Sequence, residues 1–188
     1  MLTDPKSALR KKILDLLRNQ KEEDRLKKSR AIQDRLFALP EFQRSPCIMF
    51  YASFEGEVDT TNMIKQALKL KKRIALPTIV KNQKRLVPYL IHDFDKDLTP
   101  GPYGILEASD KNAGPIDIDQ LDLVIVPGIA FDRNNKRLGR GAGYYDRFLS
   151  GLPSDTPTIG LAFDFQIFPS LPHVDAHDTP VTRVISNH

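Results

Sequence analysis

The sequence has only one cysteine in its 188 residues and no long hydrophobic run. A single cysteine, Cys47, excludes an internal disulfide, and the apolar residues beside it indicate a buried thiol of the kind common in cytoplasmic proteins. No apolar stretch approaches the roughly 18 to 20 residues that a membrane span needs. The start of the chain also lacks the apolar region of a secretory signal. We therefore expect a cytoplasmic protein with no membrane partner.

Outside its first 30 residues the chain has no excess of positive charge. The whole sequence carries a net charge of +4, and residues 1–30 contain ten Lys or Arg against five Asp or Glu, so the remainder carries −1. A protein that binds nucleic acid needs a basic face on the fold itself. This distribution argues against a nucleic-acid partner and leaves small molecules as the expected ligands.

Apolar runs of strand length alternate with helical patterns along the chain. Strands are expected at residues 47–53, 73–80, 121–128, 156–163 and 181–186. A first helix is expected to begin at Asp4-Pro5, and a second to run from about Glu22 to Ala38, where Pro40 ends it. Two more helices are expected at about 60–71 and 144–150. Residues 85–94 fit a hairpin partner for 73–80, in which Pro88 favours an edge position. This order predicts one domain, residues 1–188, of the α/β class: a three-layer α/β/α sandwich with a mostly parallel central sheet.

The most informative segment, residues 121–149, joins a buried strand to a helix through a basic loop and reads LDLVIVPGIAFDRNNKRLGRGAGYYDRFL. Its three alternating glycines are Gly139, Gly141 and Gly143. Glycines allow close approach of the backbone, and Arg137 and Arg140 offer charged donors that suit phosphate oxygens. The spacing matches neither a Walker A loop nor GxGxxG, and a tight strand–helix connection would also explain it. Tyr144 and Tyr145 would either pack on the core or flank a ring-shaped ligand.

Other polar residues stand where they would complete such a site. Lys6 and Arg10 share one helix face, although much of that helix is basic anyway. Glu57 follows a buried strand in the segment SFEGEVDT, where it would accept hydrogen bonds from a ligand, unless the segment only caps the next helix. Asp132 and Asp146 flank the glycine loop and could hold Mg²⁺ through water, or serve as helix caps or surface groups.

Four segments carry a resemblance to a known family: KSALR at residues 6–10, YASFEGEVDT at 51–60, PYGILEA at 102–108 and VPGIAFDRNNKRLGRGAGYYDRFL at 126–149. Over nearly its whole length the chain resembles the 5-formyltetrahydrofolate cyclo-ligase family, also called methenyltetrahydrofolate synthetase. The resemblance implies an ATP-dependent ligase that forms a C–N bond. It would convert 5-formyltetrahydrofolate to 5,10-methenyltetrahydrofolate with release of ADP and phosphate. The formyl oxygen would be phosphorylated, and N10 would then attack the formyl carbon.

The resemblance also implies roles for individual residues. Those expected to bind ATP are Lys6, Arg10, Arg137, Leu138, Gly139, Arg140, Gly141, Ala142, Gly143, Tyr144 and Tyr145. Those expected to bind the folate are Ala52, Glu57, Tyr103, Gly104 and Ile105. Arg140 and Tyr144 are the expected catalytic residues, Asp132 and Asp146 the expected Mg²⁺ ligands, and the protein is taken to be a monomer.

At the C-terminus the chain departs from the family pattern. Thr182 and Ser186-Asn187 stand where the family often has acidic residues, so no function is assigned there. His173 and His177 are spaced four apart, but their proline- and aspartate-rich surroundings are typical of a loop, and we expect no transition-metal site.

Two other functions remain open from the residues alone. A sugar-phosphate isomerase or a CoA-transferase-like protein would not need ATP. A module that binds nucleic acid through the basic N-terminal helices would bind in a steeply salt-dependent way.

Overall fold

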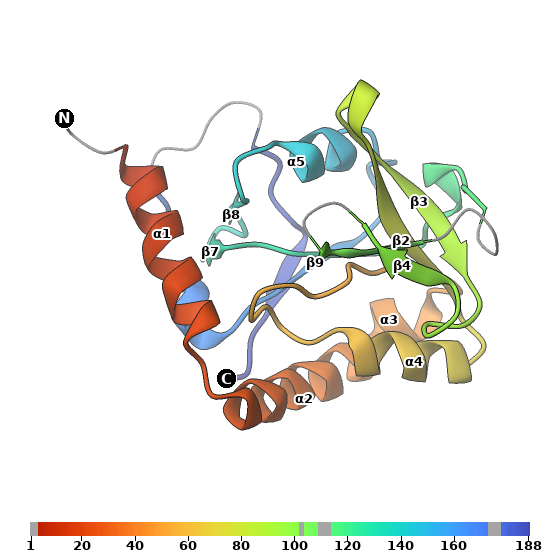
Figure 1. The fold of residues 1–188 in the computed structure, drawn as a ribbon, viewed down its shortest axis with the longest axis horizontal. Helices are drawn as coiled ribbons and strands as arrows, with labels where there is room; N and C mark the ends of the chain where they lie inside the picture. Colours follow the sequence, from red (N-terminus) through yellow and green to blue (C-terminus); the bar gives the residue numbers. More distant parts are fainter. Residues whose placement is uncertain (1–3, 102–103, 109–113, 173–177) are drawn as a thin grey trace.

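The computed structural model describes residues 4–101, 104–108, 114–172 and 178–188, and these form a three-layer α/β fold (Figure 1). The central sheet has six strands in the order β11-β9-β6-β1-β2-β3. Their bounds are Cys47–Met49 (β1), Arg73–Val80 (β2), Arg85–Ile91 (β3), Leu123–Val126 (β6), Thr158–Leu161 (β9) and Arg183–Ile185 (β11). Every neighbouring pair is parallel except β2 and β3, which form an antiparallel hairpin at one edge. The predicted α/β class and the mostly parallel sheet are confirmed.

Helices cover both faces of this sheet. Their bounds are Pro5–Arg18 (α1), Glu22–Ala38 (α2), Pro40–Arg44 (α3), Thr61–Lys69 (α4) and Tyr144–Leu149 (α5). In Figure 1, α2, α3 and α4 lie on one side of the sheet and α5 on the other. Alternate strand residues accordingly enter different cores: Ile48 packs with the α1–α4 side, whereas Met49 packs with the α5 side. A strand buried on both faces must be apolar at every position, which is why these segments are continuous apolar runs.

The helix boundaries follow the capping signals of the sequence. The Asp4 carboxylate accepts hydrogen bonds from the backbone N–H groups of Lys6 and Ser7, and Pro5 is the first helical residue of α1. Pro40 ends α2, as expected, and also begins the short helix α3, because proline at a first helical position has no N–H group to leave unpaired.

The first predicted strand, residues 47–53, is shorter in the structure. It ends at Met49, although the Phe50 N–H group still donates to the Ala75 carbonyl oxygen of β2 at 2.9 Å. Tyr51 and Ala52 remain buried beyond the end of the strand. The Thr60 hydroxyl donates to the Tyr51 carbonyl oxygen at 2.6 Å and accepts from the Ser53 N–H group at 3.2 Å. A side chain therefore satisfies the backbone where a neighbouring strand would otherwise do so.

Smaller elements that the patterns did not predict complete the fold. Ala130–Asp132 (β7), Arg137–Leu138 (β8) and Ile167–Phe168 (β10) form a three-stranded sheet, and Leu98–Pro100 (β4) pairs with Leu106–Ala108 (β5). Short 3₁₀ helices cover Lys81–Gln83, Ile118–Gln120 and Asp164–Gln166. None of the helices in the described ranges has the length and apolar content needed to cross a membrane. His173 and His177 lie outside the described residues.

Candidate active site

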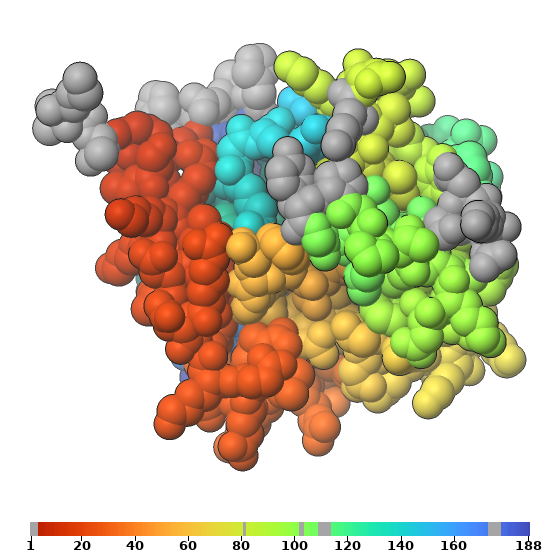
Figure 2. All heavy atoms as spheres, viewed as in Figure 1, coloured from red at the N-terminus to blue at the C-terminus, as the bar shows by residue number. Residues whose placement is uncertain are grey.

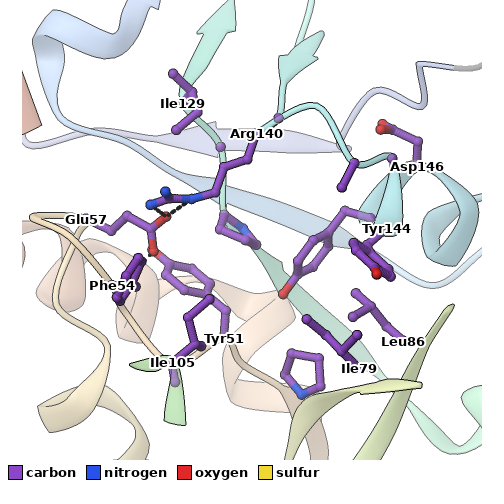
Figure 3. A pocket seen from close by; sticks show the side chains of 18 of the residues that line it. Tyr51, Phe54, Glu57, Ile79, Leu86, Ile105, Ile129, Arg140, Tyr144 and Asp146 are labelled. Atoms are coloured by element: carbon purple, nitrogen blue, oxygen red, sulfur yellow. Dashed lines mark hydrogen bonds and ion pairs between the residues drawn. The ribbon is translucent and has the colours of Figure 1, made fainter. Parts of the chain in front are cut away.

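A cavity of about 170 Å³ opens where the carboxyl ends of β1 and β6 meet the glycine loop. Tyr51, Phe54 and Glu57 enter it from the segment after β1, and Ile129 enters from the segment after β6. The β2–β3 hairpin supplies an apolar wall through Ile79 and Leu86, seen in Figure 3. In parallel sheets, ligands bind in crevices at this end of the strands.

The glycine loop follows β8 and leads into α5. Gly141 has φ +106° and Gly143 has φ +67°, in a region that side-chain-bearing residues rarely adopt. The Cβ that a substitution would add at Gly141 would meet only the Arg10 guanidinium, at 3.8 Å. The loop therefore keeps an open backbone surface beside a cation, which is an arrangement that favours an anion.

Arg137, which is buried, and Asp146, which is half-buried, form an ion pair that lines one side of the cavity. Arg137 Nη2 donates to Asp146 Oδ1 at 2.6 Å, and the guanidinium lies 5.7 Å from the centre of the Tyr145 ring. Within the described part of the chain, Arg137 Nε and the Tyr145 hydroxyl are buried with no hydrogen-bond partner. Burial raises the pKa of Tyr145, so this hydroxyl stays protonated and remains a donor. Buried donors without partners in a cavity are groups that a polar ligand would satisfy.

Arg140 and Glu57 form the second ion pair of the cavity, marked by dashed lines in Figure 3. Glu57 Oε1 accepts from Arg140 Nη2 at 2.9 Å, and Glu57 Oε2 accepts from the Phe54 N–H group at 3.1 Å. The Arg140 guanidinium also lies 5.3 Å from the centre of the Phe54 ring. Burial raises the pKa of Glu57, and the charge of Arg140 opposes that rise.

Helix α1 lies against the glycine loop, and Figure 2 shows it side by side with the segment after β1 and with the loop ahead of α5. Arg10 Nε donates to the Gly139 carbonyl oxygen at 2.9 Å. Lys6 Nζ forms an ion pair with Asp178 at 3.0 Å. The structure thus brings Arg10 directly to the loop, while the ion pair of Lys6 joins α1 to the C-terminal segment.

The two aspartates that flank the loop have different surroundings. Asp132 is buried, and its carboxylate accepts from the backbone N–H groups of Asn134, Lys136 and Leu171. Asp146 lines the cavity, whereas Asp132 does not. Among the described residues no group of three or more His, Cys, Asp or Glu side chains could enclose a metal ion. Any Mg²⁺ here would need ligands from a bound phosphate as well.

Comparison with known proteins identifies the family. A model described as the 5-formyltetrahydrofolate cyclo-ligase family matches residues 3–187. The chain belongs to that family. It is 31% identical over 188 residues to the mouse 5-formyltetrahydrofolate cyclo-ligase, covering 96% of this chain and 92% of the mouse protein. A probable cyclo-ligase of Caenorhabditis elegans is 30% identical over 199 residues, covering 98% and 93%.

The fold agrees with a solved member of the family. The NMR structure of the Aquifex aeolicus 5,10-methenyltetrahydrofolate synthetase superposes with a TM-score of 0.86 at 35% identity, covering 98% of this chain and 90% of that one. The resemblance expected from the four sequence segments is confirmed over nearly the whole chain.

Most of the family-derived residues meet at the cavity. The lining includes Ala52, Glu57, Ile105, Arg137, Gly139, Arg140, Ala142, Gly143, Tyr144 and Tyr145. Gly104 is exposed and lies outside the lining, and Leu138 points into a small core with Ala130 and Leu171. Tyr103 lies outside the described residues.

Several lining residues were missed from the sequence. Phe54 belongs to the segment already singled out for Glu57, so an aromatic beside a candidate carboxylate was a usable signal. Ile79 and Leu86 are cross-strand partners in the hairpin, and that register would have placed them side by side. Arg147 also escaped notice, although it ties the loop to the hairpin by donating to the carbonyl oxygens of Ala142 and Lys84, each at 3.0 Å.

Proposed function

We propose that the protein catalyses the ATP-dependent cyclisation of 5-formyltetrahydrofolate to 5,10-methenyltetrahydrofolate, releasing ADP and phosphate. One observation carries the proposal beyond family membership. Arg140 of the glycine loop pairs with Glu57 of the folate-side segment at 2.9 Å over one cavity. The expected phosphate-binding loop and the expected folate-binding carboxylate line the same cavity, which supports a single site for both substrates.

The chemistry needs activation of the formyl oxygen. In the substrate the formyl carbon already lies near N10, so ring closure costs little entropy. The formamide carbonyl is a weak electrophile, and hydroxide is a poor leaving group. The formyl oxygen therefore attacks the γ-phosphorus, and the bond to ADP breaks. N10 then adds to the resulting imidate phosphate and loses its proton, and phosphate leaves with the electrons of the C–O bond.

The protein supplies position and charge for these steps. The Glu57 carboxylate would accept hydrogen bonds from the N–H donors of the pterin ring, and Arg140 would stabilise charge on the phosphoryl group in transit. The aromatic and apolar walls, including Phe54 and Ile79, would exclude water from the reactive imidate. No protein nucleophile is needed.

The nucleotide would bind at the glycine loop. Arg137, with Lys6 and Arg10 on α1, would supply positive charge, and the Tyr145 hydroxyl would supply a donor. Asp146 would hold Mg²⁺ together with the phosphates of ATP, and the ion would neutralise part of their charge; the oxygens of Asp132 already accept three backbone hydrogen bonds. Tyr144, at the start of α5, would contact the nucleotide or the transferring group.

The same proposal covers the organisation of the protein. We infer one domain of residues 1–188 acting as a monomer in the cytoplasm on small molecules alone. The family match over residues 3–187 supports the single domain. The buried Cys47 thiol and the small negative charge outside residues 1–30 support the location and the lack of a nucleic-acid partner.

The experiment mixes purified protein with 5-formyltetrahydrofolate, Mg²⁺ and ATP, and follows the absorbance of the methenyl product alongside release of ADP. We expect product only with ATP, and one ADP for each methenyl group formed. A reaction without ATP would favour an isomerase-like or CoA-transferase-like activity. Intact ATP binding without product would redirect the search to another substrate.

A further inference from the structure

The turn between Phe54 and Glu57 holds a glutamate in an unfavourable backbone conformation. Glu55 has φ +48° and Gly56 has φ +79°, and the Glu57 N–H group donates to the Phe54 carbonyl oxygen at 3.1 Å. Two central residues with positive φ are typical of a type I′ turn, for which Asn-Gly is preferred. Glu55 therefore carries strain that asparagine would relieve, and strain of this kind often marks a functional position.

This turn is locked against α1. A Cβ at Gly56 would lie 2.1 Å from the Leu17 carbonyl oxygen, and Gln20 Nε2 donates to the Gly56 carbonyl oxygen at 3.1 Å. The turn cannot shift away from the helix without losing these contacts. The Glu55 side chain is accordingly held between α1 and the glycine loop.

The Glu55 carboxylate bridges two guanidinium groups. Arg18 Nη2 donates to its oxygens at 2.9 and 3.0 Å, and Arg140 Nη1 donates to Oε2 at 2.9 Å. With Glu57 on the other side of Arg140, the charges alternate in a row: Arg18, Glu55, Arg140, Glu57. The hydrogen bond from Arg140 is the main reason that the pKa of Glu55 lies below its usual value.

The contacts of Arg140 explain why carboxylates from both Glu55 and Glu57 are useful for holding its guanidinium. Glu57 holds the guanidinium through Oε1, the same carboxylate that we propose for the folate. When the Glu57 carboxylate accepts a hydrogen bond from a substrate N–H group, its hydrogen bonds with Arg140 weaken. Glu55 lies nearer the surface than Glu57 and keeps its own hydrogen bond to Nη1.

We propose that Glu55 is a positioning residue that holds the Arg140 guanidinium beside the cavity while Glu57 engages the folate. This inference rests on the proposed function. The side chain of Glu55 is the anchor, and Arg18 on α1 orients it from the opposite side. Loss of the anchor lets Arg140 move from the transferring phosphoryl group.

Glu55→Asn separates this role from a structural one. The substitution produces the preferred Asn-Gly pair for the turn, so we expect an equal or higher melting temperature. We expect kcat to fall roughly 10- to 100-fold, as when a catalytic group is displaced by about an ångström. Asp95→Asn, which removes the surface ion pair with Lys65, is the matched control and should keep normal turnover. Normal kcat in Glu55→Asn, or a loss of kcat that only follows a lower melting temperature, would overturn the inference.

A second readout does not depend on turnover. The Glu57 carboxyl group is titrated by ¹³C NMR in the wild-type protein and in Glu55→Gln. The charged and titratable groups around it are Arg140, Glu55, Tyr51, Tyr145 and Arg25, the last through the Glu57 carbonyl oxygen. Loss of the Glu55 charge by itself lowers the pKa of Glu57, whereas movement of Arg140 away from Glu57 raises it. We expect the pKa of Glu57 to rise in Glu55→Gln, because Arg140 is no longer held beside it. An unchanged or lower pKa contradicts the proposal, whereas absence of product in the wild-type protein would contradict only the proposed function.

Discussion

The Arg140 guanidinium contacts three side chains at the cavity. It forms ion pairs with Glu55 and Glu57 and lies over the Phe54 ring. We predict that Arg140→Ala lowers kcat by roughly 10²–10³, in line with the loss of one preorganised donor to a charged transition state. Steady-state turnover with both substrates saturating measures this. Arg140→Lys is the control, because it keeps the charge but loses the planar fork that can hold two carboxylates. Near-normal kcat in Arg140→Ala would remove the residue from the mechanism.

Glu57 gives a prediction about pH. Burial is the largest cause of its raised pKa, and in the proposed complex the charged form would accept the hydrogen bonds from the folate. As pH falls through this raised value the carboxylate becomes protonated, so kcat/KM for the folate should decline at a pH above the roughly 4.3 typical of glutamate. Glu57→Gln should abolish that decline.

The same variant should raise the folate KM more than the ATP KM, because only the folate contacts Glu57 in the proposed complex. Asp95→Asn, which removes a surface carboxylate paired with Lys65, is the control and should change neither KM. A larger effect on the ATP KM would place Glu57 on the nucleotide side.

At the scale of elements, the close contact between α1 and the turn after β1 is possible only because residue 56 is a glycine. Gly56→Ala would put a Cβ 2.1 Å from the Leu17 carbonyl oxygen, with φ already positive. We predict a loss of about 1–3 kcal/mol of unfolding free energy, the usual cost of an added group that forces the backbone to shift in a packed region. Denaturant unfolding measures it. Gly114→Ala is the control, since nothing lies within 4 Å of the added atom, and equal stability of the two variants would refute the packing argument.

Helices and strands defined by local sequence patterns could be predicted, whereas boundaries set by contacts between distant residues could not. The bounds of α2, Glu22–Ala38, and of β2, Arg73–Val80, follow from periodicity and neighbouring breakers. The end of β1 at Met49 does not, because it depends on the hydroxyl of Thr60 reaching the Tyr51 carbonyl oxygen. A tertiary contact overrides the apolar pattern there.

The candidate site divides in the same way. Arg140 and Glu57 could each be singled out from its motif, but their ion pair joins residues 83 positions apart and needed the fold. Asp132 and Asp146 look alike in sequence, yet one carboxylate caps a turn and the other lines the cavity. The distinction depends in part on the Leu171 N–H group, 39 residues after Asp132, which only the fold brings to this carboxylate.

For the whole molecule, ligand binding should appear as thermal stability. A ligand that binds only the folded protein at 100 times its Kd adds about 2.7 kcal/mol. For a chain of 188 residues we expect MgATP at that concentration to raise Tm by roughly 5–10 °C. Scanning fluorimetry measures the shift, and Arg140→Ala should show a smaller one. No shift with saturating nucleotide would contradict an ATP site in the folded protein.

The contacts of α1 connect the two ends of the chain. Lys6 pairs with Asp178, 172 residues later, and Arg10 donates to the Gly139 carbonyl oxygen, 129 residues later. During synthesis on the ribosome, the helix made first must therefore wait for partners that are made near the end. The contacts that fix α1 against the glycine loop and the C-terminal segment can therefore form only after most of the chain has been made.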